Sequence, residues 1–209
     1  MKLGPYIPDA TAVILAGGEN SRMGTAKSFV EIDGETILSR QLKALSELFN
    51  VTLIIARDPV AYRLPGVVTV MDDVRFGASR GPLLGLYSGL NAVVNGWAFV
   101  IACDMPFISP ALVRRMAEMR TGFDAVITTR DGFPEPLFGF YSRTVSAAAG
   151  GMLVKGDGRL RDLLGRISVG YLEEDEARIY DPGLLSLMNL NTPGELEKAA
   201  GIFGRRPKH

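Results

Sequence analysis

The chain has 209 residues, enough for one domain with a substantial buried core. It carries 23 Lys and Arg against 23 Asp and Glu, so no global charge attracts nucleic acid or an anionic membrane, and any anion site must be local. Its only histidine is His209 and its only cysteine is Cys103, which excludes a histidine-based catalytic triad, a histidine-rich metal site and an intramolecular disulfide. The cysteine content fits a reducing cytoplasm. No apolar run approaches about 18 residues and no charged segment precedes an apolar one at the start, so we expect neither a transmembrane helix nor a signal peptide.

Short apolar runs alternate with amphipathic segments along the chain. The runs predict strands at residues 11–15, 51–56, 67–71, 97–103, 124–129, 137–141 and 167–172. The segments predict helices at residues 36–49, 82–94, 109–119, 142–153, 159–164 and 192–200, with Gly201 ending the last. This alternation is typical of βαβ units and a mainly parallel sheet. We therefore expect a single α/β domain over residues 1–209, with a loose lead-in at 1–10 and a flexible tail at 204–209.

A glycine-rich segment with two cations follows the first predicted strand directly. It begins Leu15-Ala16-Gly17-Gly18 and continues through Arg22 to Lys27. Glycines let a backbone approach a ligand closely, and successive N–H groups in such a turn bind anions. The spacing matches neither a P-loop nor a dinucleotide fingerprint. The segment therefore predicts a polyphosphate site of another kind; the alternative is an ordinary connection with solvated basic side chains.

Acidic residues follow two other predicted strands. Asp72 and Asp73 come after residues 67–71, and Asp104 follows residues 97–103 and precedes a proline. Ligands of parallel sheets bind at the carboxyl ends of the strands, where these residues should meet the glycine-rich segment. Mg²⁺ prefers one or two carboxylates together with phosphate oxygens and water, so Asp104 is a candidate metal ligand. The alternative is an aspartate that caps its own turn.

Three further motifs allow both a structural and a functional interpretation. Gly81, before Pro82, starts a helix whose free N–H groups favour an anion or an acceptor atom, unless it is a plain helix start. Glu135 stands in a proline-rich turn and either meets a second substrate or only shapes the turn. Asn191 or Thr192 is a good N-cap for the last helix, which leaves Asn189 as a candidate for the active site.

Taken together, these motifs resemble the molybdenum cofactor guanylyltransferases, a family of nucleotidyltransferases. The segments that carry the resemblance run in order through nearly the whole chain: Leu15-Ala16-Gly17-Gly18, Ser21-Arg22-Met23-Gly24, Lys27, Gly81-Pro82-Leu83, Cys103-Asp104-Met105-Pro106, Pro134-Glu135-Pro136-Leu137 and Asn189-Leu190-Asn191-Thr192-Pro193. Many sugar-nucleotide and cytidylyl enzymes share the glycine-rich motif. The Asn-x-Asn-Thr-Pro ending makes the combination more specific.

The resemblance implies a fold and a reaction. The fold is a Rossmann-like three-layer α/β sandwich with a mainly parallel, mixed sheet of the nucleotide-diphospho-sugar transferase type. The reaction transfers GMP from Mg-GTP to the terminal phosphate of the molybdenum–molybdopterin cofactor and releases pyrophosphate. Alternatives are a cytidylyltransferase for the same cofactor, a sugar-phosphate nucleotidylyltransferase and a non-enzymatic nucleotide-binding module.

The resemblance also assigns roles to residues. Arg22 and Lys27 would stabilise the transition state and the pyrophosphate, and Asp104 would hold Mg²⁺. The nucleotide would contact the segment from Leu15 to Gly18, Lys27, Gly81 and either Asp72 or Asp73, whereas Asn189 and Asn191 would lie near the pterin. The implied partners are GTP and the molybdopterin cofactor, with molybdoenzymes or their chaperones as candidate recipients of the product, and neither nucleic acid nor membrane.

Overall fold

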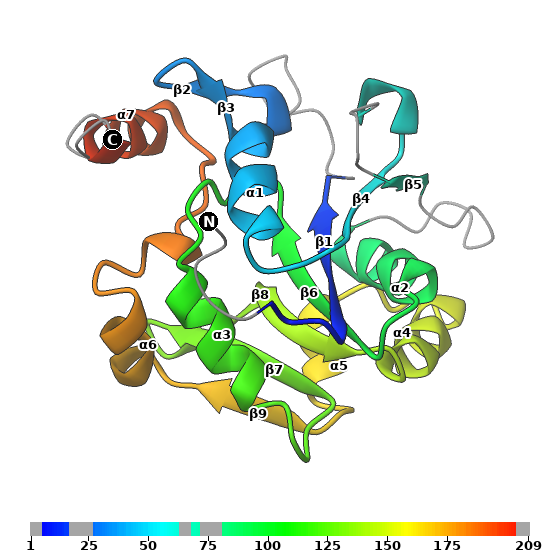
Figure 1. Cartoon of the computed structure of the whole chain (residues 1–209). Helices are drawn as coiled ribbons and strands as arrows, with labels where there is room; N and C mark the ends of the chain where they lie inside the picture. The colour runs from blue at the N-terminus through cyan, green and yellow to red at the C-terminus, as the bar shows by residue number, and fades with distance from the viewer. Residues whose placement is uncertain (1–5, 17–26, 63–67, 72–80, 204–209) are drawn as a thin grey trace.

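The computed structural model describes residues 6–16, 27–62, 68–71 and 81–203. Within them, one sheet of seven strands has the order β5-β4-β1-β6-β8-β7-β9 (Figure 1). These strands are β1 (Ala10–Leu15), β4 (Thr52–Ala56), β5 (Val68–Met71), β6 (Trp97–Ala102), β7 (Ala125–Arg130), β8 (Phe133–Ser142) and β9 (Val169–Leu172). A separate two-stranded sheet pairs β2 (Glu31–Ile32) with β3 (Glu35–Thr36).

Helices cover both faces of the large sheet, which makes three layers (Figure 1). The α-helices are α1 (Ile37–Ser46), α2 (Pro82–Ala92), α3 (Pro110–Glu118), α4 (Val145–Val154), α5 (Leu160–Leu164), α6 (Glu174–Tyr180) and α7 (Pro193–Phe203). The described residues also form the 3-10 helices η1 (Lys27–Phe29), η2 (Pro59–Tyr62) and η4 (Leu185–Leu187). None of the helices in these parts of the chain is long and apolar enough to cross a membrane.

The sheet is mixed and mainly parallel. Strand β1 runs parallel to its neighbours β4 and β6, and β5 runs parallel to β4. Strand β8 is antiparallel to both β6 and β7, whereas β9 is parallel to β7. These directions confirm the predicted Rossmann-like α/β class.

Two apolar cores, one on each face of the sheet, account for the continuous apolar runs in the sequence. Every residue of β1 is buried. Ala12 and Ile14 pack with α1 and α3, whereas Val13 and Leu15 pack with α2 and α4. A strand whose two faces are both covered needs apolar side chains at every position, not at alternate ones.

Several details differ from the sequence prediction. Helix α6 was not predicted, because its sequence is mostly charged and only Ala177 of it is buried. Helix α1 ends at Ser46, before the predicted limit of 49. Strand β8 begins at Phe133, so the proline-rich segment predicted as a turn is strand. In the expected lead-in, Ile7 is buried and donates its N–H to Leu48.

Gly201 does not end α7, which continues to Phe203. A glycine inside a helix costs only about 1 kcal/mol relative to alanine. The turn around it is stabilised by packing, because Ala199 belongs to a third apolar cluster that Ile202 contacts. The expected tail at 204–209 lies outside the described residues.

Candidate functional site

The carboxyl ends of three adjacent parallel strands meet around Leu15 and Ala16. The Ala16 N–H donates to the Ile55 carbonyl at 2.8 Å, and the Cys103 N–H donates to the Leu15 carbonyl at 3.1 Å. The first bond continues the ladder towards β4 and the second continues it towards β6. The first two residues of the predicted phosphate-binding segment are therefore held between the ends of the neighbouring strands.

Helix α2 begins above the same edge. A Cβ built on Gly85, in the first turn of α2, would lie 3.4 Å from the Leu15 side chain, so this turn packs on the end of β1. Gly81 caps the helix without a side-chain hydrogen bond, and Pro82 follows it. The φ of Gly81 is 103°, a value that favours glycine. Within the part of the chain that the structure describes, no side chain caps the start of α2, which therefore offers backbone N–H groups beside Leu15.

Asp104 stands in a turn after β6 that is fixed from two sides. The buried Gln41 of α1 donates through Nε2 to the carbonyls of Ala102 and Met105, at 2.8 and 2.9 Å. The Leu190 N–H donates to the Asp104 carbonyl at 2.9 Å. Because these bonds bracket Asp104, its half-buried side chain projects from a backbone of fixed conformation.

Glu135 of β8 faces this turn. Its half-buried carboxylate accepts hydrogen bonds from the Leu137 N–H and from the Asn189 side chain, both of which lower its pKa. Burial is the largest effect and raises the pKa, so the net shift is upward. The carboxylate of Asp104 raises it further, whereas the charge of Arg130 lowers it. Two acidic side chains and an amide therefore meet at the end of β6.

The segment between α6 and α7 brings Asn189 to this place. The Ser109 N–H, at the start of α3, donates to the Ser186 hydroxyl at 2.8 Å. Arg130, at the end of β7, donates to the Leu187 carbonyl at 2.7 Å. These long-range bonds fix the segment just before Asn189, so the position of this amide depends on the folded sheet.

Lys27 opens the 3-10 helix η1, whose next two residues are anchored on η2. The hydroxyls of Ser28 and Tyr62 lie 3.1 Å apart, and both residues are buried. The rings of Phe29 and Tyr62 stack with centroids 5.1 Å apart. The pKa of Tyr62 is raised, first by burial, and Cys103 adds to the shift. The backbone of Lys27 is therefore held beside η2.

The structure brings some of the predicted residues together and leaves others outside the described residues. Leu15, Ala16, Asp104 and Asn189 meet at the carboxyl edge, with Gly81 at the start of α2 above it. The predicted residues that lie outside the description are Gly17, Gly18, Arg22, Asp72, Asp73 and the side chain of Lys27.

Asn191 has a local structural role. It is exposed, and its N–H donates to the Glu195 carboxylate at 2.8 Å. Thr192 and Glu195 exchange hydrogen bonds at the start of α7, which is a capping box. The N-cap predicted at Asn191 or Thr192 is thus formed by Thr192.

Sequence reasoning missed Gln41. Its signal was available: it is a polar residue on the face of α1 that otherwise buries Ile37, Leu38 and Leu45. A polar residue on the buried face of a helix indicates a hydrogen bond in the core, because burying an amide without a partner costs folding free energy.

The donor set at this edge fits a hard cation that also binds substrate. No group of three or more His, Cys, Asp or Glu side chains able to hold a metal occurs among the residues that the structure describes. Asp104 supplies one carboxylate, and Mg²⁺ takes one or two carboxylates from protein when phosphates and water complete its shell.

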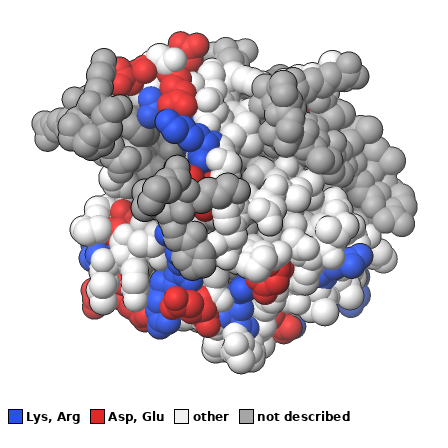
Figure 2. All heavy atoms as spheres, viewed as in Figure 1, with Lys and Arg blue, Asp and Glu red and all other residues white. Residues whose placement is uncertain are grey.

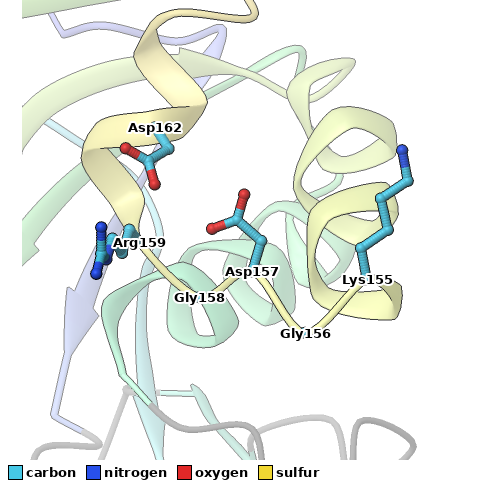
Figure 3. Close-up of a pocket in the computed structure, with 6 residues that line it drawn as sticks. All are labelled: Lys155, Gly156, Asp157, Gly158, Arg159 and Asp162. Carbon is cyan, nitrogen blue, oxygen red and sulfur yellow. The ribbon is translucent and has the colours of Figure 1, made fainter.

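The molecule has other polar features that contribute nothing to this edge. A hollow of about 450 Å³ lies in the loop between α4 and α5. In Figure 3 the carboxylates of Asp157 and Asp162 both point into it, whereas Lys155 points away. Arg166 pairs with Asp157 at 3.0 Å, and none of the edge residues lines the hollow. On the face shown in Figure 2, acidic and basic side chains are interspersed.

Comparison with known proteins identifies the family. Residues 12–171 match the family model described as the MobA-like NTP transferase domain. A protein of Natranaerobius thermophilus named "Probable molybdenum cofactor guanylyltransferase" is 33% identical over 200 residues, which cover 94% of this chain and 98% of the relative. A "Molybdenum cofactor guanylyltransferase" of Syntrophotalea carbinolica is 34% identical over 90% of this chain and 89% of its own.

Comparison with solved structures supports the same fold. The molybdopterin-guanine dinucleotide biosynthesis protein A of Archaeoglobus fulgidus superposes with a TM-score of 0.81 at 26% identity, covering 94% of this chain and 100% of that one. A 2-C-methyl-D-erythritol 4-phosphate cytidylyltransferase of Thermus thermophilus has a TM-score of 0.66 at 18% identity, over 92% of this chain and 98% of its own, and shares the fold alone. The resemblance predicted from the sequence is confirmed, and the chain belongs to the molybdenum cofactor guanylyltransferase family of nucleotidyltransferases.

Proposed function

We propose that this protein transfers GMP from Mg-GTP to the terminal phosphate of the molybdenum–molybdopterin cofactor, forming the guanine dinucleotide cofactor and pyrophosphate. The observation that carries the proposal is the meeting of Asp104 with Leu15 and Ala16 on one side and Asn189 on the other. A nucleotide site and an acceptor site on opposite sides of one carboxylate suit a transfer between two substrates.

The chemistry requires little covalent help from the protein. Phosphoryl-type transfer depends on charge neutralisation and in-line placement. Asp104 would hold Mg²⁺, which would neutralise charge on the triphosphate, and Arg22 and Lys27 would stabilise the departing pyrophosphate. The attacking phosphate needs no general base, because it is already largely anionic at neutral pH with a second pKa of about 6.

The two substrates would use different parts of the edge. The triphosphate would bind the backbone from Leu15 to Gly18, with Lys27 and the start of α2 at Gly81. Asp72 or Asp73 would accept hydrogen bonds from the guanine, and Asn189 with Asn191 would contact the pterin side.

Family membership supports the choice of substrates. Relatives that cover about nine-tenths of the chain carry the guanylyltransferase name, which favours GTP and the molybdopterin cofactor as substrates. A location in the cytoplasm and delivery to molybdoenzymes or their chaperones complete the proposal.

The test is incorporation of label from GTP or CTP into the molybdopterin cofactor in the presence of Mg²⁺. We expect product with GTP, and a decrease in kcat of about 100-fold or more for Asp104→Asn, comparable to loss of one transition-state contact. Asp175→Asn is the matched control, because Asp175 is exposed on α6. Product with CTP alone would refute the guanylyl assignment, and no product with either nucleotide would favour a binding module.

A further inference from the structure

The strand β8 breaks register where it passes the end of β6. Against β7, Ile127 pairs with Gly139 but the next residue, Thr128, pairs with Glu135. Three residues of β8 therefore bulge out of the ladder. The buried Tyr141 hydroxyl donates to the Pro136 carbonyl at 2.7 Å and holds this bulge closed. Bulges of this kind turn side chains towards active sites.

The bulge places Glu135 beyond the end of β6. The last pair between the two strands is Ile101 with Phe138, and β8 is antiparallel, so earlier residues of β8 extend past the carboxyl edge. Asp104 lies at that edge. The register of both neighbouring strands thus requires Glu135 to lie near Asp104, which agrees with their electrostatic interaction.

Glu135 also fixes the amide of Asn189. The Asn189 side chain interacts with this carboxylate and lowers its pKa, which indicates that the Nδ2 donor of the amide, and not its oxygen, faces Glu135. The backbone next to this amide is held by the bond from the Leu190 N–H to Asp104. Because its backbone is held and its Nδ2 faces Glu135, the amide of Asn189 can accept a hydrogen bond from another donor through Oδ1.

We infer that Glu135 is a positioning residue for the acceptor substrate: it orients Asn189 so that Oδ1 accepts a hydrogen bond from an N–H group of the acceptor's heterocycle. This inference rests on the proposed function. It makes the pair of Glu135 and Asn189 a determinant of acceptor specificity, because an oriented amide oxygen rejects a ring that lacks a matching donor.

Steady-state kinetics distinguish this role from a structural one. We expect Glu135→Ala to raise the KM for the acceptor about tenfold or more, with the KM for GTP changed less than about twofold. Asn189→Ala should have a similar effect, and the double variant should be no worse than either single variant. Glu118→Ala, which removes an exposed carboxylate of α3, is the control and should change neither KM.

The conservative variant Glu135→Gln separates positioning from metal binding. Its amide oxygen still accepts from Asn189, so the acceptor KM should stay within about threefold of the wild-type value. If Glu135→Gln is as impaired as Glu135→Ala and needs more Mg²⁺, Glu135 is a metal ligand and the inference is wrong. Equal changes in the KM of both substrates would also overturn it.

An NMR measurement, which needs no turnover, tests the role of Glu135 independently of the proposed function. In the NMR spectrum of the full-length protein, one side-chain amide proton of Asn189 should be shifted downfield by the bond to Glu135. The shift should be lost in Glu135→Ala and kept in Glu118→Ala. If the wild type forms no product, the proposed function fails, while this signal still decides whether Glu135 orients Asn189; its absence in the wild type would refute the orientation.

Discussion

At the scale of single residues, Gln41 shows how a buried polar group can fix the backbone of the candidate site. It is fully buried on α1, and both of its hydrogen bonds reach the turn that carries Asp104. Its Oε1 has no hydrogen-bond partner among the residues that the structure describes. Burying an amide whose oxygen has no partner costs folding free energy. The two hydrogen bonds that Nε2 donates to the Asp104 turn offset this cost, and they explain why a polar residue stands here.

Replacing Gln41 with Met should therefore damage catalysis more than folding. Methionine fills nearly the same volume, but the carbonyls of Ala102 and Met105 lose their donor. We expect a loss of about 1–3 kcal/mol in the free energy of unfolding and a larger proportional loss of kcat, because Asp104 is no longer fixed.

The control is Leu38→Met, an equally buried position on the same helix, where a hydrophobic exchange of similar volume should cost less than about 1.5 kcal/mol and leave kcat unchanged. Denaturant unfolding and turnover measured on the same samples check both effects. A Gln41→Met protein with wild-type kcat would show that the turn does not depend on the amide.

At the scale of elements, the close approach of α2 to β1 sets where the start of α2 lies. A Cβ built on Gly89 would lie 2.8 Å from Cγ1 of Val13, inside any contact that real side chains make. One turn earlier, Gly85 packs against Leu15. The glycines at positions 85 and 89 therefore let α2 pack closely on β1, and this packing fixes where the helix begins.

Gly89→Ala should push α2 away from the sheet. We expect the free energy of unfolding to fall by about 1–3 kcal/mol, the usual cost of overpacking, and the KM for the nucleotide to rise because the N–H groups near Gly81 move. Gly151→Ala is the matched control in α4: nothing lies within 4 Å of its Cβ, so this variant should be about 0.4–1 kcal/mol more stable than wild type. Chemical denaturation compares them, and equal stability of the two variants would contradict the packing argument.

The elements also show what the sequence can and cannot predict. The strands that bury both faces were found because most of their positions are apolar, without polar residues at alternate positions, and parallel topology then predicted that Asp104 would lie at the same edge as Leu15. Helix α6 was missed because it has little apolar pattern of its own: only Ala177 is buried, and polar contacts such as that of Arg115 with Glu176 tie it to its neighbours.

The site beyond these strand ends depends on long-range contacts. The proline-rich motif singled out Glu135, but the register break that directs it to the site was not predicted, and Gln41 reaches a turn about sixty residues away in the chain. Such pairings depend on how the strands are arranged in space, which the sequence pattern alone does not determine.

At the scale of the whole molecule, two parts of the chain meet at the Asp104 turn. In the proposed function, β1, η1 and α2 would form the nucleotide side, whereas β8 and the segment before α7 would form the acceptor side. The antiparallel direction of β8 makes this possible, because its early residues run past the end of β6. Bonds from Gln41 and Leu190 tie the turn to α1 and to the C-terminal segment, so binding of substrate should stabilise the fold as a whole.

Mg-GTP should accordingly raise the melting temperature of the protein. A ligand that binds only the folded state at about 100 times its Kd adds about 2.7 kcal/mol of stability. For a protein of this size each kcal/mol corresponds to roughly 2–4 °C, so we expect a shift of about 5–11 °C in a thermal unfolding scan. EDTA should remove most of the shift, and Asp104→Asn should lose the part that depends on Mg²⁺, whereas Asp175→Asn should respond like wild type. If GTP stabilises Asp104→Asn and wild type equally with and without Mg²⁺, Asp104 does not hold the metal, and the nucleotide binds through backbone and basic groups alone.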